Sequence, residues 1–198
     1  MMIYDITQPL FECEVFPGDP KPEKFEICRI EKGDSFNLSS LSMCVHNGTH
    51  IDAPYHFYKD GKGIDKINLE KCIGPAYVET HDGDVTGTDA QKMLERASKL
   101  NSEACRKILI KGKATVTIDA AKVFALAGID LIGVESQTVG PEDGPMAVHL
   151  ELLKQEVVLL EGIRLENVAD GVYLLNCAPL NLTGTDGSPC RAILMDLS

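Results

Sequence analysis

His46-Asn-Gly-Thr-His-Ile-Asp-Ala-Pro-Tyr-His56 is the stretch from which the rest of this 198-residue chain can be understood. It contains three of the five histidines of the chain, together with the carboxylate of Asp52. Imidazole is the commonest protein ligand of transition metals and titrates near neutral pH. Three imidazoles and a carboxylate beside glycine and proline would be costly in an ordinary core, because buried polar groups need partners. The stretch therefore predicts a metal site.

Two backbone conformations would place these side chains differently. On a helix, His46 and His50 would share one face, but the glycine and the proline of the stretch disfavour a helix. An extended backbone points residues of one parity to the same side. The candidate ligands are all even-numbered: His46, His50, Asp52 and, beyond the bend at Pro54, His56. We therefore expect an extended segment, whose two imidazoles and one carboxylate suit zinc, manganese or ferrous iron.

The remainder of the chain predicts an α/β fold. A turn is expected at 16–20, followed by strands at 25–30, where alternating residues predict half-burial, and at 39–45. Further strands are expected at 75–79, 107–110, 131–134, 157–160, 172–176 and 192–197. Helices are expected at 89–100, capped by Thr88 or Asp89, and at 119–126 and 146–154. Short apolar strands that alternate with helices indicate a mixed β-sheet covered by helices. No repeat or linker divides the chain, so residues 1–198 are expected to form a single domain.

Composition narrows the classes of partner. The chain is 44% hydrophobic and 25% charged, and its net charge of -11 disfavours nucleic acid and anionic membranes as partners. A small-molecule substrate is the expectation. No signal-peptide or membrane-spanning pattern is present. The seven cysteines are scattered without a CxxC pair, which predicts reduced thiols and a cytoplasmic location.

The histidine-rich stretch resembles the HxGTHxDxPxH signature of the metal-dependent cyclase family, which includes the bacterial kynurenine formamidases. All seven defined positions of that signature are present. The likeness extends to residues 4–10 and 17–20 near the N-terminus, and to 175–180 and 186–192 near the C-terminus. The resemblance implies a cyclase-like domain of the swivelling β/β/α type, with one mixed sheet covered by helices.

The resemblance also implies ligands that the local pattern does not contain. In the family, a late histidine is followed a dozen residues on by a glutamate, and His149 and Glu161 stand in that relation. By this carry-over, His46, His50 and Asp52 hold one metal ion. Asp52, His149 and Glu161 hold a second, so that Asp52 bridges the two. Zinc is the expected metal, as one or two ions, with manganese as the alternative.

The reaction implied by the family is hydrolysis of an amide by metal-activated water. Its best-known substrate is N-formyl-L-kynurenine, an intermediate of tryptophan catabolism. His56 stands in the position of the general acid/base. Phe16 and Phe57 are candidate substrate contacts, although ordinary core packing would explain them equally well. Where the family usually has an aspartate, this chain has Glu135, whose side chain is longer by one methylene. We expect this difference to change the geometry on the substrate side more than the binding of the metal. His81 matches nothing in the family and is expected in a loop.

Two other functions remain open at this point. The chain could be a hydrolase or cyclase of the same family that acts on another cyclic amide, such as isatin, or on a lactone. A metal-binding protein without catalytic activity is the alternative from another class, although an intact His56 disfavours it. The family also implies a homodimer or a homotetramer.

Overall fold

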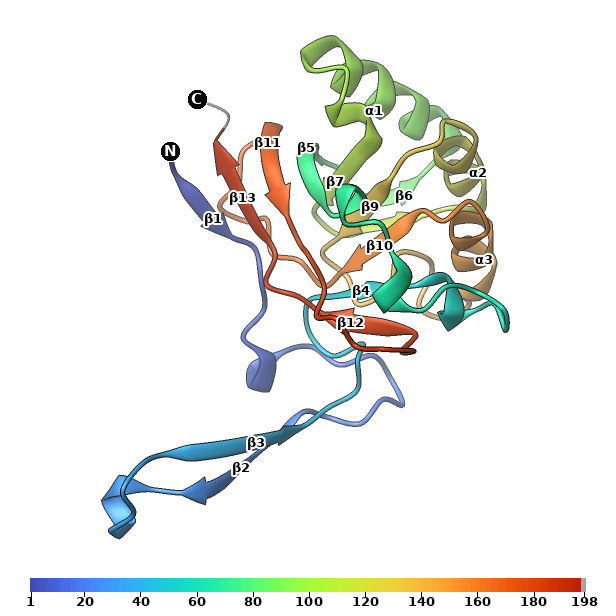
Figure 1. Ribbon diagram of the computed structural model, residues 1–198. Coiled ribbons are helices and arrows are strands. Elements are labelled where there is room, and N and C mark those ends of the chain that lie inside the picture. Colours follow the sequence, from blue (N-terminus) through green and yellow to red (C-terminus); the bar gives the residue numbers. More distant parts are fainter. Residues whose placement is uncertain (197–198) are drawn as a thin grey trace.

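One nine-stranded sheet organises the molecule (Figure 1). The computed structural model describes residues 1–196. The strands lie in the order β1-β13-β11-β5-β7-β9-β10-β4-β12. Their bounds are β1 Ile3–Asp5, β4 His50–Asp52, β5 Ile73–Thr80, β7 Lys107–Lys111, β9 Leu131–Val134, β10 Val158–Glu161, β11 Gly171–Asn176, β12 Gly187–Pro189 and β13 Ile193–Asp196. Strands β5, β7, β9 and β10 run parallel, and all other neighbours pair antiparallel. The predicted mixed sheet is confirmed.

Three helices cover one face of this sheet (Figure 1). They are α1 Gly87–Leu100, α2 Ile118–Leu126 and α3 Met146–Lys154, each within two residues of its predicted bounds. The predicted cap of α1 was wrong. Thr86 is the cap: its hydroxyl accepts from the Asp89 amide, while the Asp89 carboxylate accepts from the Thr86 amide. This reciprocal pair is a capping box.

The central strands bury both of their faces. On β7, Ile108 and Ile110 pack toward the helices, whereas Leu109 enters a second core on the opposite face. That second core also contains Ile51 of β4 and Leu194 of β13. These two strands lie near opposite ends of the sheet, so the sheet must curl for their side chains to share one core. Strands buried on both faces need continuous apolar sequence, which is why β7, β9 and β10 were predictable.

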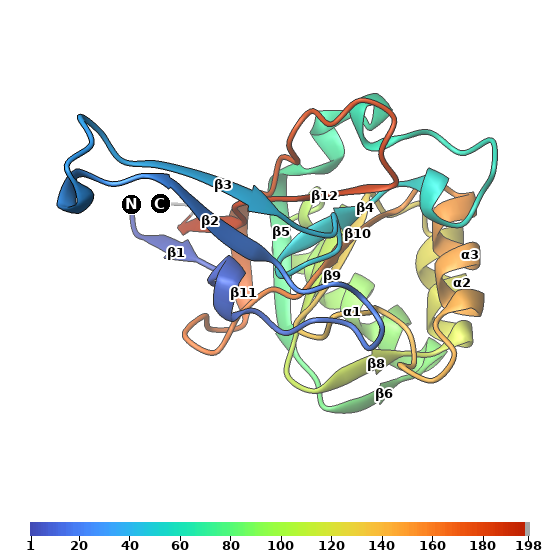
Figure 2. The ribbon, with the colours of Figure 1, turned by 90° about the horizontal axis from the view of Figure 1, so that it is seen from below.

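A two-stranded hairpin projects from the body (Figures 1 and 2). It consists of β2 Glu23–Cys28 and β3 Leu38–Ser42, paired antiparallel. The half-buried strand predicted at 25–30 is wrong in burial, since β2 is exposed on both faces except at Cys28. The strand predicted at 39–45 ends at Ser42. A separate small parallel sheet joins β6 Gly83–Val85 to β8 Ala114–Val116.

The C-terminal strand predicted at 192–197 corresponds to β13, and Leu197 lies outside the described residues. Within residues 1–196, every helix falls short of the length and hydropathy needed to cross a bilayer.

Candidate active site

Six of the predicted site residues converge on one cavity of about 190 Å³. They come from separate elements: His46 from the turn after β3, His50 and Asp52 from β4, His56 from the 3-10 helix Pro54–His56, His149 from α3 and Glu161 from the end of β10. All of them except Asp52 line the cavity, and the Asp52 carboxylate lies next to the imidazoles of His46 and His149.

Only part of the stretch has the extended backbone that the parity of its residues predicts. His50 and Asp52 lie on the short strand β4 and point to the same side, toward Glu161 and His149. Residues 45–49 form turns and bends instead of the expected extended segment, and Gly48 has a φ of 67°. Positive φ is readily adopted by glycine. His46 therefore reaches the site around a turn, which corrects the prediction of one continuous extended segment.

The buried imidazoles of His50 and His149 are both held by a backbone carbonyl group at Nδ1. The Nδ1 of His50 lies 3.0 Å from the Gly48 carbonyl oxygen, and the Nδ1 of His149 lies 2.9 Å from the Pro145 carbonyl oxygen. A carbonyl only accepts, so each ring donates from Nδ1. The Nε2 atoms then face carboxylates: that of His50 lies 3.3 Å from Glu161, and that of His149 lies 3.2 Å from Glu161. Backbone carbonyls that fix the ring tautomer in this way are typical of metal-binding histidines.

One oxygen of Asp52 accepts no hydrogen bond from residues 1–196. The Oδ1 atom lies 2.9 Å from Nδ1 of His46, whereas the buried Oδ2 lies 3.6 Å from Nε2 of His149, beyond hydrogen-bond distance. Leaving a buried charged acceptor unsatisfied is costly. Single atoms of Asp52, His149 and Glu161 lie within 4.8 Å of one another, as do atoms of Asp52, His46 and His50. The orphan oxygen and the oriented imidazoles fit one or two divalent cations.

The electrostatics of the cluster favour a cation. Burial alone lowers the pKa of His149, but the carboxylates of Asp52 and Glu161 outweigh it and raise that pKa to about 10. The same carboxylates raise the pKa of His50 well above its ordinary value, against its complete burial. Burial raises the pKa of Asp52, yet the imidazoles of His149 and His46 hold it well below the usual range. The carboxylates therefore stay ionised and attract either protons on the imidazoles or a metal ion.

Asp186 is a site residue that the sequence reasoning missed. Its Oδ2 lies 2.8 Å from Nε2 of His46 and 3.2 Å from Nδ1 of His56. The backbone amide of Ala53 donates to the Asp186 carbonyl oxygen, and Gly187 pairs with Asp52 in the sheet. The segment 186–192 was noticed for its family likeness, but nothing local marks Asp186 as a site residue. Its position depends on strand pairing with β4.

Phe16, Phe57 and His81 are the remaining candidates from the sequence. Phe16 and Phe57 both line the cavity, as do Gln137 and Thr138, which the sequence did not suggest. His81 lies in the loop between β5 and β6, as predicted.

Glu135 is engaged away from the metal ligands. Its Oε2 accepts from the Gly112 amide at 2.6 Å, and its Oε1 accepts from the Leu165 amide at 2.7 Å. The longer glutamate side chain therefore ties two loops together beside a neighbouring cavity.

The fold and the site together define an α/β protein with a buried cluster of histidines and carboxylates that could bind a metal ion. The family model described as "Putative cyclase" matches residues 4–141, so the chain belongs to the cyclase family. A kynurenine formamidase of Bacillus cytotoxicus is 35% identical to it, over 98% of this chain and 97% of that protein.

Solved structures agree on the fold. "The Structure Of Potential Metal-Dependent Hydrolase With Cyclase Activity" superposes with a TM-score of 0.80 at 27% identity, over 98% of this chain and 96% of that one. Isatin hydrolase A of Ralstonia solanacearum superposes with a TM-score of 0.82 at 20% identity, over 98% and 92% of the two chains. At that identity the second likeness concerns the fold alone.

Proposed function

We propose that this chain is a metal-dependent amide hydrolase that cleaves N-formyl-L-kynurenine to kynurenine and formate. The observation that carries the proposal is the buried pair Asp52 and Glu161, faced by His50 and His149 beside a cavity. The kynurenine formamidases that resemble the chain over nearly its whole length support the substrate.

The residues present would hold the metal in two overlapping sets. His46, His50 and Asp52 form the first, and Asp52, His149 and Glu161 form the second. Nitrogen and carboxylate ligands suit zinc, which is the metal we propose first, with manganese as the alternative. A divalent cation bound there would lower the pKa of a water molecule and stabilise negative charge on the carbonyl oxygen.

His56 is the residue proposed to move the proton. Its Nδ1 faces the Asp186 carboxylate, which leaves Nε2 as the ring atom available to a substrate in the cavity. An anilide nitrogen leaves poorly unless it is protonated, and His56 would deliver the proton as the carbon–nitrogen bond breaks. Asp186 would hold the His56 ring in the required tautomer. Phe16 and Phe57 would flank the aryl ring.

Metal content and turnover test the proposal together. Purified protein is analysed by mass spectrometry for metal, then assayed with N-formylkynurenine before and after chelation. We expect one or two ions per chain, loss of activity with the chelator and recovery with zinc or manganese. His56→Ala should keep the metal but lose about 100-fold or more in turnover, whereas His81→Ala should match the wild type.

Two results would contradict this function. One is negligible bound metal combined with wild-type activity in His50→Ala. The other is stoichiometric metal with turnover unchanged in His56→Ala, which would remove the catalytic assignment and leave a metal-binding protein. Isatin belongs in the same assay, since a higher kcat/KM for isatin would assign the enzyme to cyclic amides.

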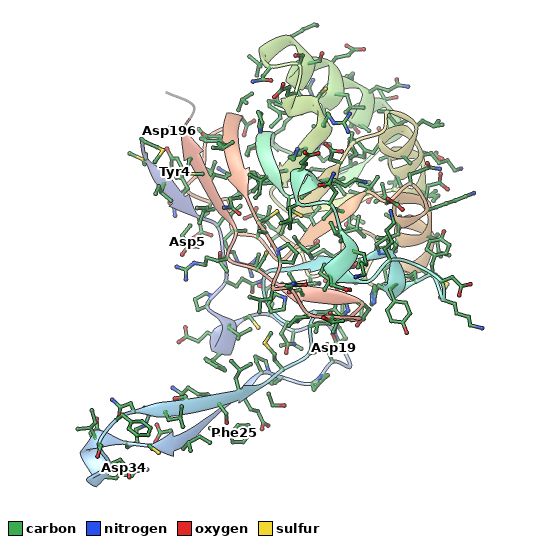
Figure 3. All side chains as sticks on the ribbon, viewed as in Figure 1. Tyr4, Asp5, Asp19, Phe25, Asp34 and Asp196 are labelled. Carbon is green, nitrogen blue, oxygen red and sulfur yellow. The ribbon has the colours of Figure 1, made fainter. Side chains whose placement is uncertain are left out.

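We also propose that the chain assembles with copies of itself, as a homodimer or homotetramer. Phe25, Ile27, Leu38 and Leu41 of the hairpin are 46–57% exposed, and Figure 3 shows Phe25 on the hairpin away from the body. An isolated two-stranded hairpin is marginal in water, so a second copy would stabilise it. Light scattering after gel filtration tests this, and a monomer at micromolar concentration would contradict it.

The proposed location is the cytoplasm, with no nucleic-acid or membrane partner. All seven cysteines are free thiols, as a reducing compartment favours. The net charge of -11 opposes binding to phosphate backbones.

A further inference from the structure

A second, larger cavity adjoins the histidine cavity. Its volume is about 790 Å³, and Phe16 and Gln137 line both cavities. Three segments form its walls: residues 14–17, residues 112–115 at the start of β8, and residues 135–137. Asp82, Glu142 and Arg164 complete the lining. A substrate whose amide lies among the histidines would therefore extend past Phe16 into this space.

Arg164 is a preorganised cation in the wall of the second cavity. Its Nη1 donates to the carbonyl oxygens of Glu135 and Ile163, both at 2.9 Å. Its Nη2 lies 3.3 Å from the Glu14 carboxylate, whose side chain is 69% exposed. Backbone carbonyls carry no charge to neutralise a guanidinium, and an exposed ion pair contributes little. Arg164 thus keeps the capacity to bind a carboxylate in the two-pronged geometry that guanidinium favours.

Two of the acidic side chains that line this cavity are tied to backbone amides. Both oxygens of Glu135 accept amide hydrogens, and one oxygen of Asp82 accepts from the Lys113 amide at 2.9 Å. Glu14 and Glu142 are the remaining carboxylates of the lining. The lining therefore combines the fixed Arg164 guanidinium and the Lys113 side chain with the carboxylates of Glu14 and Glu142, a set of charges that complements a carboxylate next to an ammonium.

We propose that the second cavity binds an α-amino-acid group carried by the substrate at a distance from the amide that is cleaved. Arg164 takes the carboxylate, and Glu14 with Glu142 takes the ammonium. This inference rests on the proposed function, because it presumes that the amide lies among the histidines. It makes Arg164 a specificity-determining residue that favours aryl formamides with a zwitterionic tail over neutral substrates such as formanilide or isatin.

The experiment compares three formamides on the metal-loaded enzyme: N-formylkynurenine, its decarboxylated analogue and formanilide. Loss of one charged hydrogen-bonding pair should lower kcat/KM by about 10- to 100-fold. We expect the wild type to prefer N-formylkynurenine over the decarboxylated analogue by that factor. Arg164→Gln should abolish the preference, mainly through KM, while the kcat/KM for formanilide stays within about threefold. Arg164→Lys should restore part of the preference, and Lys122→Gln, at an exposed position of α2, should retain all of it.

Binding of the products supplies a readout that does not depend on turnover. Calorimetry with kynurenine and with its decarboxylated analogue should give the same preference in the wild type and none in Arg164→Gln. Equal losses for all three substrates in Arg164→Gln, or no preference in the wild type, would overturn the inference while leaving the hydrolase intact. Carboxylate-dependent binding of kynurenine without turnover of any formamide would instead overturn the proposed function and keep the subsite.

Discussion

Replacing Asp186 with asparagine should slow the reaction without removing the metal. Asp186 is 40% exposed on its side chain, and its Oδ2 lies 2.8 Å from His46 and 3.2 Å from His56. A hydrogen bond to a charged group contributes about 1.5–3 kcal/mol, and solvent screening reduces this to about 1 kcal/mol for each contact. Two contacts give about 2 kcal/mol, which is about 30-fold in rate.

The assay follows kynurenine formation spectrophotometrically and measures bound metal in the same sample. Asp186→Asn should lower kcat by about 30-fold, with KM within about threefold and metal content unchanged. Asp119→Asn is the matched control, since this carboxylate is 78% exposed on α2 and its ion-pair partner is the exposed Lys122. Wild-type kcat in an Asp186→Asn protein that retains its metal would refute the positioning role. Loss of metal instead would mean that Asp186 acts through His46 alone.

Two further predictions concern packing and pH. Gly187→Ala would put a Cβ 2.8 Å from the His46 ring. Overpacking of about 2 kcal/mol should lower the Tm measured by calorimetry by about 4–8 °C. Gly144→Ala is the control and should leave the Tm unchanged, because a Cβ there meets no described atom within 4 Å. Burial raises the pKa of Asp130, but the hydrogen-bonded Arg106 guanidinium brings it below its usual value. The ionised carboxylate therefore stabilises the fold above about pH 4 and loses this effect as pH falls through the folded pKa. In urea unfolding, Asp130→Asn should cost about 1 kcal/mol at about pH 7 and progressively less as the pH falls below about 4. A deficit that stays constant as the pH falls would exclude the ion pair as its cause.

The site residues that could be predicted from the sequence are those whose positions depend on a local pattern of residues. Parity placed His50 and Asp52 correctly because two residues suffice to define the side of a strand. It failed for His46, since the conformation of a turn depends on how the chain enters it. His149 and Glu161 were reached only through family likeness, although a carboxylate that directly ends an apolar strand is a signal of burial that could have been used. Asp186 carries no local signal, because pairing between strands of three residues has no measurable periodicity.

The strand β4 shows why the fold and the site depend on each other. His50 lies opposite Glu161 of β10, and Asp52 lies opposite Gly187 of β12, so one short strand sets the register of both halves of the site. Ile51, between them, is fully buried in the core on the opposite face. A shift of one residue would exchange the faces, placing an imidazole and a carboxylate in that apolar core and an isoleucine among the ligands. The burial of a charged pair without partners is prohibitive. The apolar packing of Ile51 therefore fixes the positions of the residues proposed to bind metal, in a strand too short to hold its register by hydrogen bonds alone.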